Sequence, residues 1–106
     1  MRLLDAQQAF CLNIAKLVLW AYEQGYEITF GESFDDDGVG HMKNSNHFIR
    51  LAQDFNLFEK DKYLRDSESY SRLGQAWKAL DPINRWGGDF KKPDGNHFSI
   101  LWDGNS

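Results

Sequence analysis

LAQDFNLF, residues 51–58, is the stretch that decides the fold of this chain. Apolar and polar side chains alternate along it, which predicts a β-strand with Leu51, Phe55 and Leu57 on one face. Asp54 then projects from the middle of the strand on the opposite, less hydrophobic face. The pattern therefore predicts a half-buried strand that presents a carboxylate away from the core.

The sequence before this strand predicts one helix and one further strand. Apolar side chains recur at helical spacing over about residues 5–24, and Gly25 provides a stop. Asp5 and Gln8 match a capping box at the start of this helix. Residues 26–31 alternate and are rich in aromatic and β-branched side chains, which indicates a strand.

The sequence after the central strand predicts a hairpin, a helix and two more strands. Residues 59–64 are expected to turn and return as the second arm of a hairpin. Asp66 or Ser67 is the expected cap of a second helix, which Asp81-Pro82 ends. A short strand is expected within residues 86–90, then a turn, and a last strand over residues 97–102. The fold class is thus α+β, with an antiparallel sheet and flanking helices.

Length and composition predict a single domain over residues 1–106. The chain is 42% hydrophobic and 15% aromatic, as expected for a globular core. Its net charge of −4 and its lack of a basic patch argue against a nucleic-acid partner. Cys11 is the only cysteine, so an internal disulfide is excluded and any zinc must be bound through nitrogen and oxygen.

No segment of the sequence predicts a membrane span. The most apolar stretch, residues 9–22, contains Asn13 and Lys16 and is shorter than the roughly 18 to 20 apolar residues that a span needs. The N-terminus lacks the pattern of a secretory signal peptide. We therefore expect a soluble, monomeric protein that accumulates in the cytoplasm.

Two histidines and two aspartates supply the side chains of a catalytic zinc site. His47 and Asp54 lie seven residues apart, and Asp94 and His97 follow far downstream. Three of these side chains can bind the metal and leave one position open, and the remaining carboxylate can act as a base toward water. Spacing alone is weak support, because a His and an Asp at this separation are common in proteins without a metal.

The order of the surrounding motifs is far more specific. Ser-x-His is followed by Arg-Leu-Ala-x-Asp, Trp-Gly-Gly-x-Phe and Asp-x-x-His-Phe, at residues 45–47, 50–54, 86–90 and 94–98. This order closely resembles the zinc D-alanyl-D-alanine carboxypeptidase and L-alanyl-D-glutamate peptidase family, in particular its phage endolysin branch. The resemblance implies the fold shared with the Hedgehog signalling domain, with zinc held on a small antiparallel sheet.

The resemblance also implies roles for individual residues. His47, Asp54 and His97 match the zinc ligands of the family, and Asp94 matches its catalytic base. Ser45 is expected to help orient His47. The implied substrate is the peptide stem of bacterial peptidoglycan. An L-alanyl-D-glutamate endopeptidase of a phage fits best, acting on the wall after a separate protein has permeabilised the membrane.

One position departs from the family pattern. Asp35 stands where relatives commonly have an Arg suited to binding substrate carboxylate. Arg50, Arg65 or Lys43 could replace that cation. The alternatives are therefore a D-alanyl-D-alanine carboxypeptidase, or a catalytically silent module that binds zinc or peptidoglycan. The acidic run 35–38 lacks the full calcium-loop pattern, so a solvated loop is favoured over calcium binding.

Overall fold

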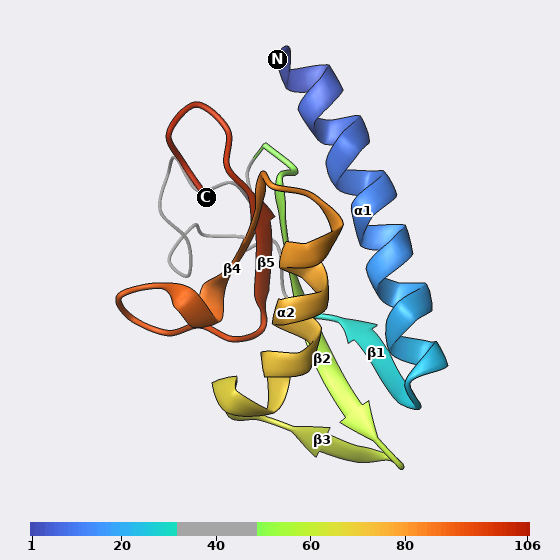
Figure 1. The fold of residues 1–106 in the computed structure, drawn as a ribbon. Coiled ribbons are helices and arrows are strands. Elements are labelled where there is room, and N and C mark those ends of the chain that lie inside the picture. Colours follow the sequence, from blue (N-terminus) through green and yellow to red (C-terminus); the bar gives the residue numbers. More distant parts are fainter. Residues whose placement is uncertain (32–48) are drawn as a thin grey trace.

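The computed structural model describes residues 1–31 and 49–106. In chain order these residues form α1 (Leu3–Glu23), β1 (Tyr26–Phe30), β2 (Ala52–Glu59), β3 (Lys62–Leu64), the 3₁₀ turn η1 (Ser67–Tyr70), α2 (Ser71–Leu80), β4 (Asn84–Trp86), the 3₁₀ turn η2 (Gly87–Asp89) and β5 (His97–Ile100). Figure 1 shows the helices packed beside a small sheet. The α+β class expected from the sequence is confirmed.

The sheet is built around β2. Within the described residues it has five strands in the order β1-β2-β5-β4, with β3 also paired to β2, and every pairing is antiparallel. The first part of β2, residues 52–54, pairs with β5, whereas its second part, residues 55–59, pairs with β1. β2 therefore joins the two halves of the sheet (Figure 1).

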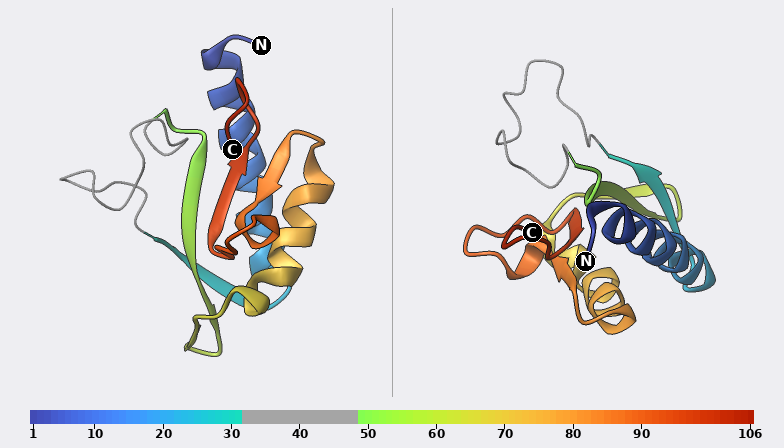
Figure 2. Two further views of the ribbon diagram at one scale, coloured as in Figure 1. Left: turned by 90° about the vertical axis from the view of Figure 1, so that its left-hand side faces the viewer. Right: turned by 90° about the horizontal axis from the view of Figure 1, so that it is seen from above.

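One face of the sheet is covered by both helices, as the left view of Figure 2 shows. Phe55 and Leu57 of β2 and Phe98 of β5 are fully buried on this face. Trp77 of α2 joins the layers, because its ring meets Phe98 and its indole N–H donates to the carbonyls of β4 and β5. The predicted alternation of residues 51–58 is thus confirmed.

By alternation, the opposite face of the sheet carries Asp54, Asn56 and Phe58 of β2, after the buried Ala52 at the start of the strand. We call this the open face. Tyr63 of β3 lies on it, because Tyr63 is paired with Phe58 and the two rings are 5.3 Å apart. The two faces of β2 therefore serve different purposes, one packing the core and the other presenting polar groups.

The predicted helix caps are wrong. α1 begins at Leu3, so Asp5 lies in its first turn, where the carboxylate accepts hydrogen bonds of 2.9 and 3.0 Å from Arg2. Ser67 begins a 3₁₀ turn before α2, and its hydroxyl accepts the backbone N–H of Gly95 instead of a helical N–H. In both cases another partner binds the side chain that was expected to cap the helix, a neighbouring arginine for Asp5 and a remote backbone N–H for Ser67.

Two predicted strands have different boundaries. The strand expected within residues 86–90 is β4, which ends at Trp86, and the chain then turns through η2. The last strand ends at Ile100, while Trp102 pairs with Asn105 in an isolated bridge. Among the helices of the described residues, none is long and apolar enough to cross a membrane.

Candidate metal centre

Asp54 and His97 are directly opposite each other in the ladder between β2 and β5. The Nδ1 atom of His97 is 3.4 Å from the Oδ1 atom of Asp54, and their side chains are only 9% and 14% exposed. His97 is the first residue of β5, as the sequence predicted. Because alternation places Asp54 on the open face, its partner His97 projects to that face as well.

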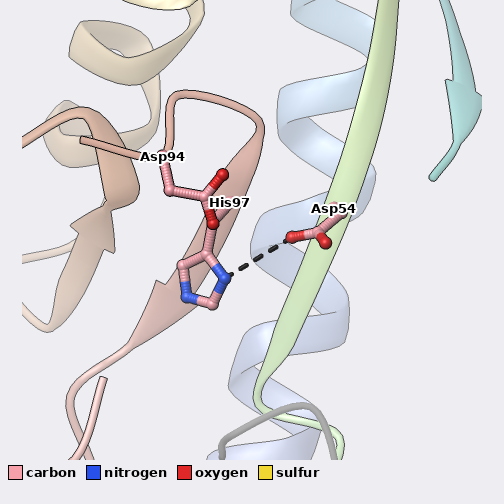
Figure 3. A group of neighbouring side chains, drawn as sticks. All are labelled: Asp54, Asp94 and His97. Atoms are coloured by element: carbon pink, nitrogen blue, oxygen red, sulfur yellow. Dashed lines mark ion pairs between the residues drawn. The ribbon is translucent and has the colours of Figure 1, made fainter. Parts of the chain in front are cut away.

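The turn before β5 brings Asp94 to the same place. The backbone N–H of His97 donates to the carbonyl of Asp94 at 3.1 Å, which folds the chain back on itself. Asp54, Asp94 and His97 each offer a donor atom, and these atoms all lie within 4.8 Å of one another. Figure 3 shows the carboxylate of Asp94 on the same side as the His97 ring. Asp94 is exposed whereas His97 is buried, so the cluster has one solvent-facing carboxylate.

Gly87 fixes the position of this turn. Its carbonyl accepts the backbone N–H groups of Asp94 at 2.9 Å and of Phe90 at 3.1 Å. A Cβ atom at Gly87 would lie 2.8 Å from the Cβ of His97 and would also collide with the carbonyl of Asp94. A side chain at this position would therefore push apart two members of the cluster.

A tryptophan and a serine hold Gly95, the residue between Asp94 and β5. The indole N–H of Trp86 donates to the Gly95 carbonyl at 2.7 Å, and Ser67 Oγ accepts the Gly95 N–H at 2.9 Å. The Trp86 ring lies against Gly74 of α2 and against Gly88, where added Cβ atoms would meet the indole. These contacts leave the Asp94 turn little freedom to move.

The sequence pattern predicts no role in the site for Ser67 or Gly95. Nothing in the local pattern separates Ser67 from an ordinary helix cap, and its partner is 28 residues away. The Trp-Gly-Gly motif was the available signal, because bare backbone beside a large ring indicates close packing. His97 has one further aromatic neighbour, Phe90, whose ring centroid is 5.4 Å from the imidazole.

The donor set fits a zinc ion. Zinc binds nitrogen and carboxylate oxygen at about 2.0 to 2.2 Å in a tetrahedron, so its ligand atoms are separated by roughly 3.4 Å. The distance of 3.4 Å between His97 and Asp54 matches this edge and is long for a direct hydrogen bond. Cys11 is exposed on α1 and does not belong to the group. The predicted ligand His47, together with Ser45 and Asp35, lies outside the described residues.

Two of the three cations considered as replacements at the site lie within the described residues. Arg50 lines a hollow with Gln7 and Cys11 of α1, on the helix side of the sheet. The guanidinium of Arg65 lies 5.1 Å from the ring centroid of Tyr63, which places it on the open face with Asp54. The third, Lys43, lies outside the described residues.

Residues 39–100 match the family model described as D-alanyl-D-alanine carboxypeptidase, which is more than half of the chain. The chain belongs to this family of peptidases. A search of curated proteins found no match. Among solved structures, the L-Ala D-Glu endopeptidase ChiX of Serratia marcescens is similar, with a TM-score of 0.67 and 17% identity over 92% of this chain and 84% of that one. That likeness shows a shared fold, and the family predicted from the motifs is confirmed.

Proposed function

We propose that this chain is a zinc-dependent L-alanyl-D-glutamate endopeptidase that cuts the peptide stem of peptidoglycan. The observation that carries the proposal is the grouping of Asp54, Asp94 and His97 on the open face. Membership of a peptidase family supports the reaction class, and the L-Ala D-Glu endopeptidase activity of the similar Serratia protein supports the choice of bond.

In this proposal His47, Asp54 and His97 hold the zinc ion. A bound zinc ion supplies Lewis acidity, which polarises the scissile carbonyl and lowers the pKa of water. The burial of His97 and its packing against Phe90 keep the imidazole in one orientation. The position of Asp54 on a central strand gives the second ligand a rigid backbone.

Asp94 acts as the general base and acid. Its carboxylate takes a proton from the water molecule that attacks the carbonyl carbon, and it then delivers that proton to the amide nitrogen as the C–N bond breaks. The products are a new carboxylate and a free amine. Asp94 suits this role because its side chain is exposed, while its backbone is held by Gly87 and by its neighbour Gly95.

The test uses zinc-loaded protein on purified peptidoglycan, with product analysis by mass spectrometry. We expect new L-alanine C-termini and D-glutamate N-termini, and no product after treatment with a chelator. Asp94→Asn should abolish product while the zinc content stays unchanged. Asp89→Asn is the matched control, because Asp89 lies on the same loop but faces Lys78 in an exposed ion pair. Full activity in Asp94→Asn would contradict the assigned role.

The description of the family favours one other reaction, D-alanyl-D-alanine carboxypeptidase activity. The same assay separates the two, because the carboxypeptidase releases free D-alanine and leaves the L-alanyl-D-glutamate bond intact. A chain that binds one zinc ion per molecule and forms neither product would instead be a silent binding module.

The biological setting that we propose is phage-induced lysis. The protein would accumulate in the host cytoplasm and reach the wall when the membrane is permeabilised. Expression in bacteria should therefore be tolerated until chloroform is added, and the culture should then clear. Clearing that is equally fast in Asp94→Asn cells would contradict this role.

A further inference from the structure

We propose that Arg65, stacked on Tyr63, binds a carboxylate of the substrate next to the bond that is cut. The inference rests on the proposed peptidase function and names a residue that recognises its substrate. The shared chemistry is a free carboxylate, which is either the α-carboxylate of a γ-linked D-glutamate or the C-terminal carboxylate of a D-alanyl-D-alanine peptide.

Polar side chains follow one another along the open face from the metal centre toward Arg65. Asn56 follows Asp54 by two residues on β2, so the two side chains share a face about 7 Å apart. The Tyr63 hydroxyl donates to Asn56 Oδ1 at 3.3 Å, and the Asn56 amide donates to Thr29 of β1 at 3.3 Å. The ring of Tyr63 is therefore fixed at one edge by hydrogen bonding.

Arg65 uses this ring as a support. Its guanidinium lies 5.1 Å from the centroid of the Tyr63 ring, within the range of a cation–π contact. Arg65 is exposed, and no carboxylate of residues 1–31 or 49–106 lies within ion-pair distance of it. The five N–H donors of the guanidinium thus remain available for a bidentate contact with a carboxylate.

The charges of the site explain why a cation is needed here. Asp54 and Asp94 are both acidic, and the whole chain has a net charge of −4. An anionic stem peptide that approaches this face meets repulsion from both carboxylates. Arg65 lies on the same face as Asp54, where its positive charge offsets that repulsion. Arg65 thereby supplies the positive charge that relatives commonly have at the position of Asp35.

The experiment compares ligands that differ only in this charge. One pair is an L-alanyl-γ-D-glutamyl peptide with its α-carboxylate free or amidated, and the other is a D-alanyl-D-alanine peptide with its C-terminus free or amidated. Activity of zinc-loaded protein gives kcat and KM for each. Calorimetry with ketomethylene analogues, which cannot be cut, gives Kd without any requirement for turnover.

We expect the wild-type protein to prefer the free carboxylate of one pair by about 10- to 100-fold in Kd and in KM, with little change in kcat. The pair that shows the preference identifies the source of the carboxylate. In Arg65→Gln the preference should fall to within about 3-fold, whereas Arg65→Lys should keep part of it.

Lys62→Gln is the matched control, because it removes one positive charge from the same hairpin. Lys62 shares its face of β3 with Leu64, which packs against the core, so it projects away from Tyr63. The preference of the Lys62→Gln variant for the free carboxylate should equal that of the wild type. Equal binding of both members of each pair by the wild-type protein, or an unchanged preference in Arg65→Gln, would overturn the inference. Carboxylate-dependent binding without cleavage would contradict only the proposed peptidase activity.

Discussion

Asp54 and His97 face each other across the β2–β5 ladder, with Oδ1 and Nδ1 separated by 3.4 Å. Two residues that are 43 positions apart in the chain thus become cross-strand neighbours on one rigid sheet. The backbone hydrogen bonds of the ladder, rather than a flexible loop, set their separation.

Removal of the Asp54 carboxylate should reduce zinc affinity. We expect Asp54→Ala to weaken zinc binding by at least about 100-fold, since a lost ligand costs more than a lost supporting group. The wild-type melting temperature should rise with zinc, because stabilisation reaches about 2.7 kcal/mol at 100 times Kd. Competition with a chromogenic chelator and thermal melts measure both effects. Asp61→Asn, in the hairpin turn, is the control, and an equal zinc shift in Asp54→Ala would exclude Asp54 as a ligand.

Loss of the Ser67 hydroxyl should affect catalysis more than stability. Ser67→Ala leaves the Gly95 N–H without its acceptor, which should cost about 1 kcal/mol in the free energy of unfolding. Because Gly95 follows Asp94, kcat should fall while zinc affinity is unchanged. Ser69→Ala is matched to it, since Ser69 lies in the same 3₁₀ turn and bonds Asp66 at an exposed site. Urea titrations and steady-state kinetics distinguish the two, and equal kcat values would contradict the coupling.

A side chain at Gly87 should disturb the cluster itself. Gly87→Ala places a methyl group against the Asp94 carbonyl and the Cβ of His97. We expect a stability loss of about 1 to 3 kcal/mol and weaker zinc binding. A stable Gly87→Ala protein with normal zinc affinity would show that the turn can move freely. Gly31→Ala, with contacts of 3.2 Å to Asp54, should be milder in both measurements.

Tyr70 should make stability sensitive to alkaline pH. Its hydroxyl donates to Leu64 O at 2.9 Å and accepts the Leu57 N–H at 3.1 Å, and burial raises the pKa of this phenol above its usual value of 10.0. The folded state therefore disfavours the ionised ring, so this contribution is present below about pH 10 and is lost as the pH rises above it.

Tyr70→Phe tests this account. The variant should lose about 1 to 2 kcal/mol at neutral pH, and its stability should decline less steeply than that of the wild type above pH 10. Chemical unfolding between pH 7 and pH 11 provides the measurement. Tyr22→Phe is the control, because the Tyr22 hydroxyl is bonded at an exposed site. Parallel curves for Tyr70→Phe and the wild type would contradict the role of burial.

The sequence predicted the strand β2 and the faces of its side chains, because a period of two is a local property. It also predicted the hairpin and the position of His97 at the start of β5. The register that places Asp54 opposite His97 was not predictable from spacing, since pairing between remote strands depends on the whole sheet. The family motifs supplied the residues of the site, and the fold supplied their separation.

The predictions that were wrong concern the helix caps and the end of one strand. Asp5 and Ser67 are good helix caps in isolation, yet Arg2 and Gly95 compete for them. The local pattern predicts a strand within residues 86–90, although the bare backbone of Gly87 and Gly88 forms a turn that packs against Asp94 and Trp86. For Ser67 and Gly87 the deciding contact comes from a later part of the chain, and a local pattern contains no information about it.

Because β2 is one continuous strand, the cluster of Asp54, Asp94 and His97 lies near one end and the turn of the β2–β3 hairpin lies at the other, while β3 runs back toward the cluster and leads into Arg65. The tip of that hairpin, Lys60 and Asp61, adopts positive φ angles and makes no contribution to the cluster. Insertions or exchanges there would leave the positions of Asp54, Asp94 and His97 intact. The turn is therefore suited to protein engineering, because new segments can be inserted there at a distance from the cluster.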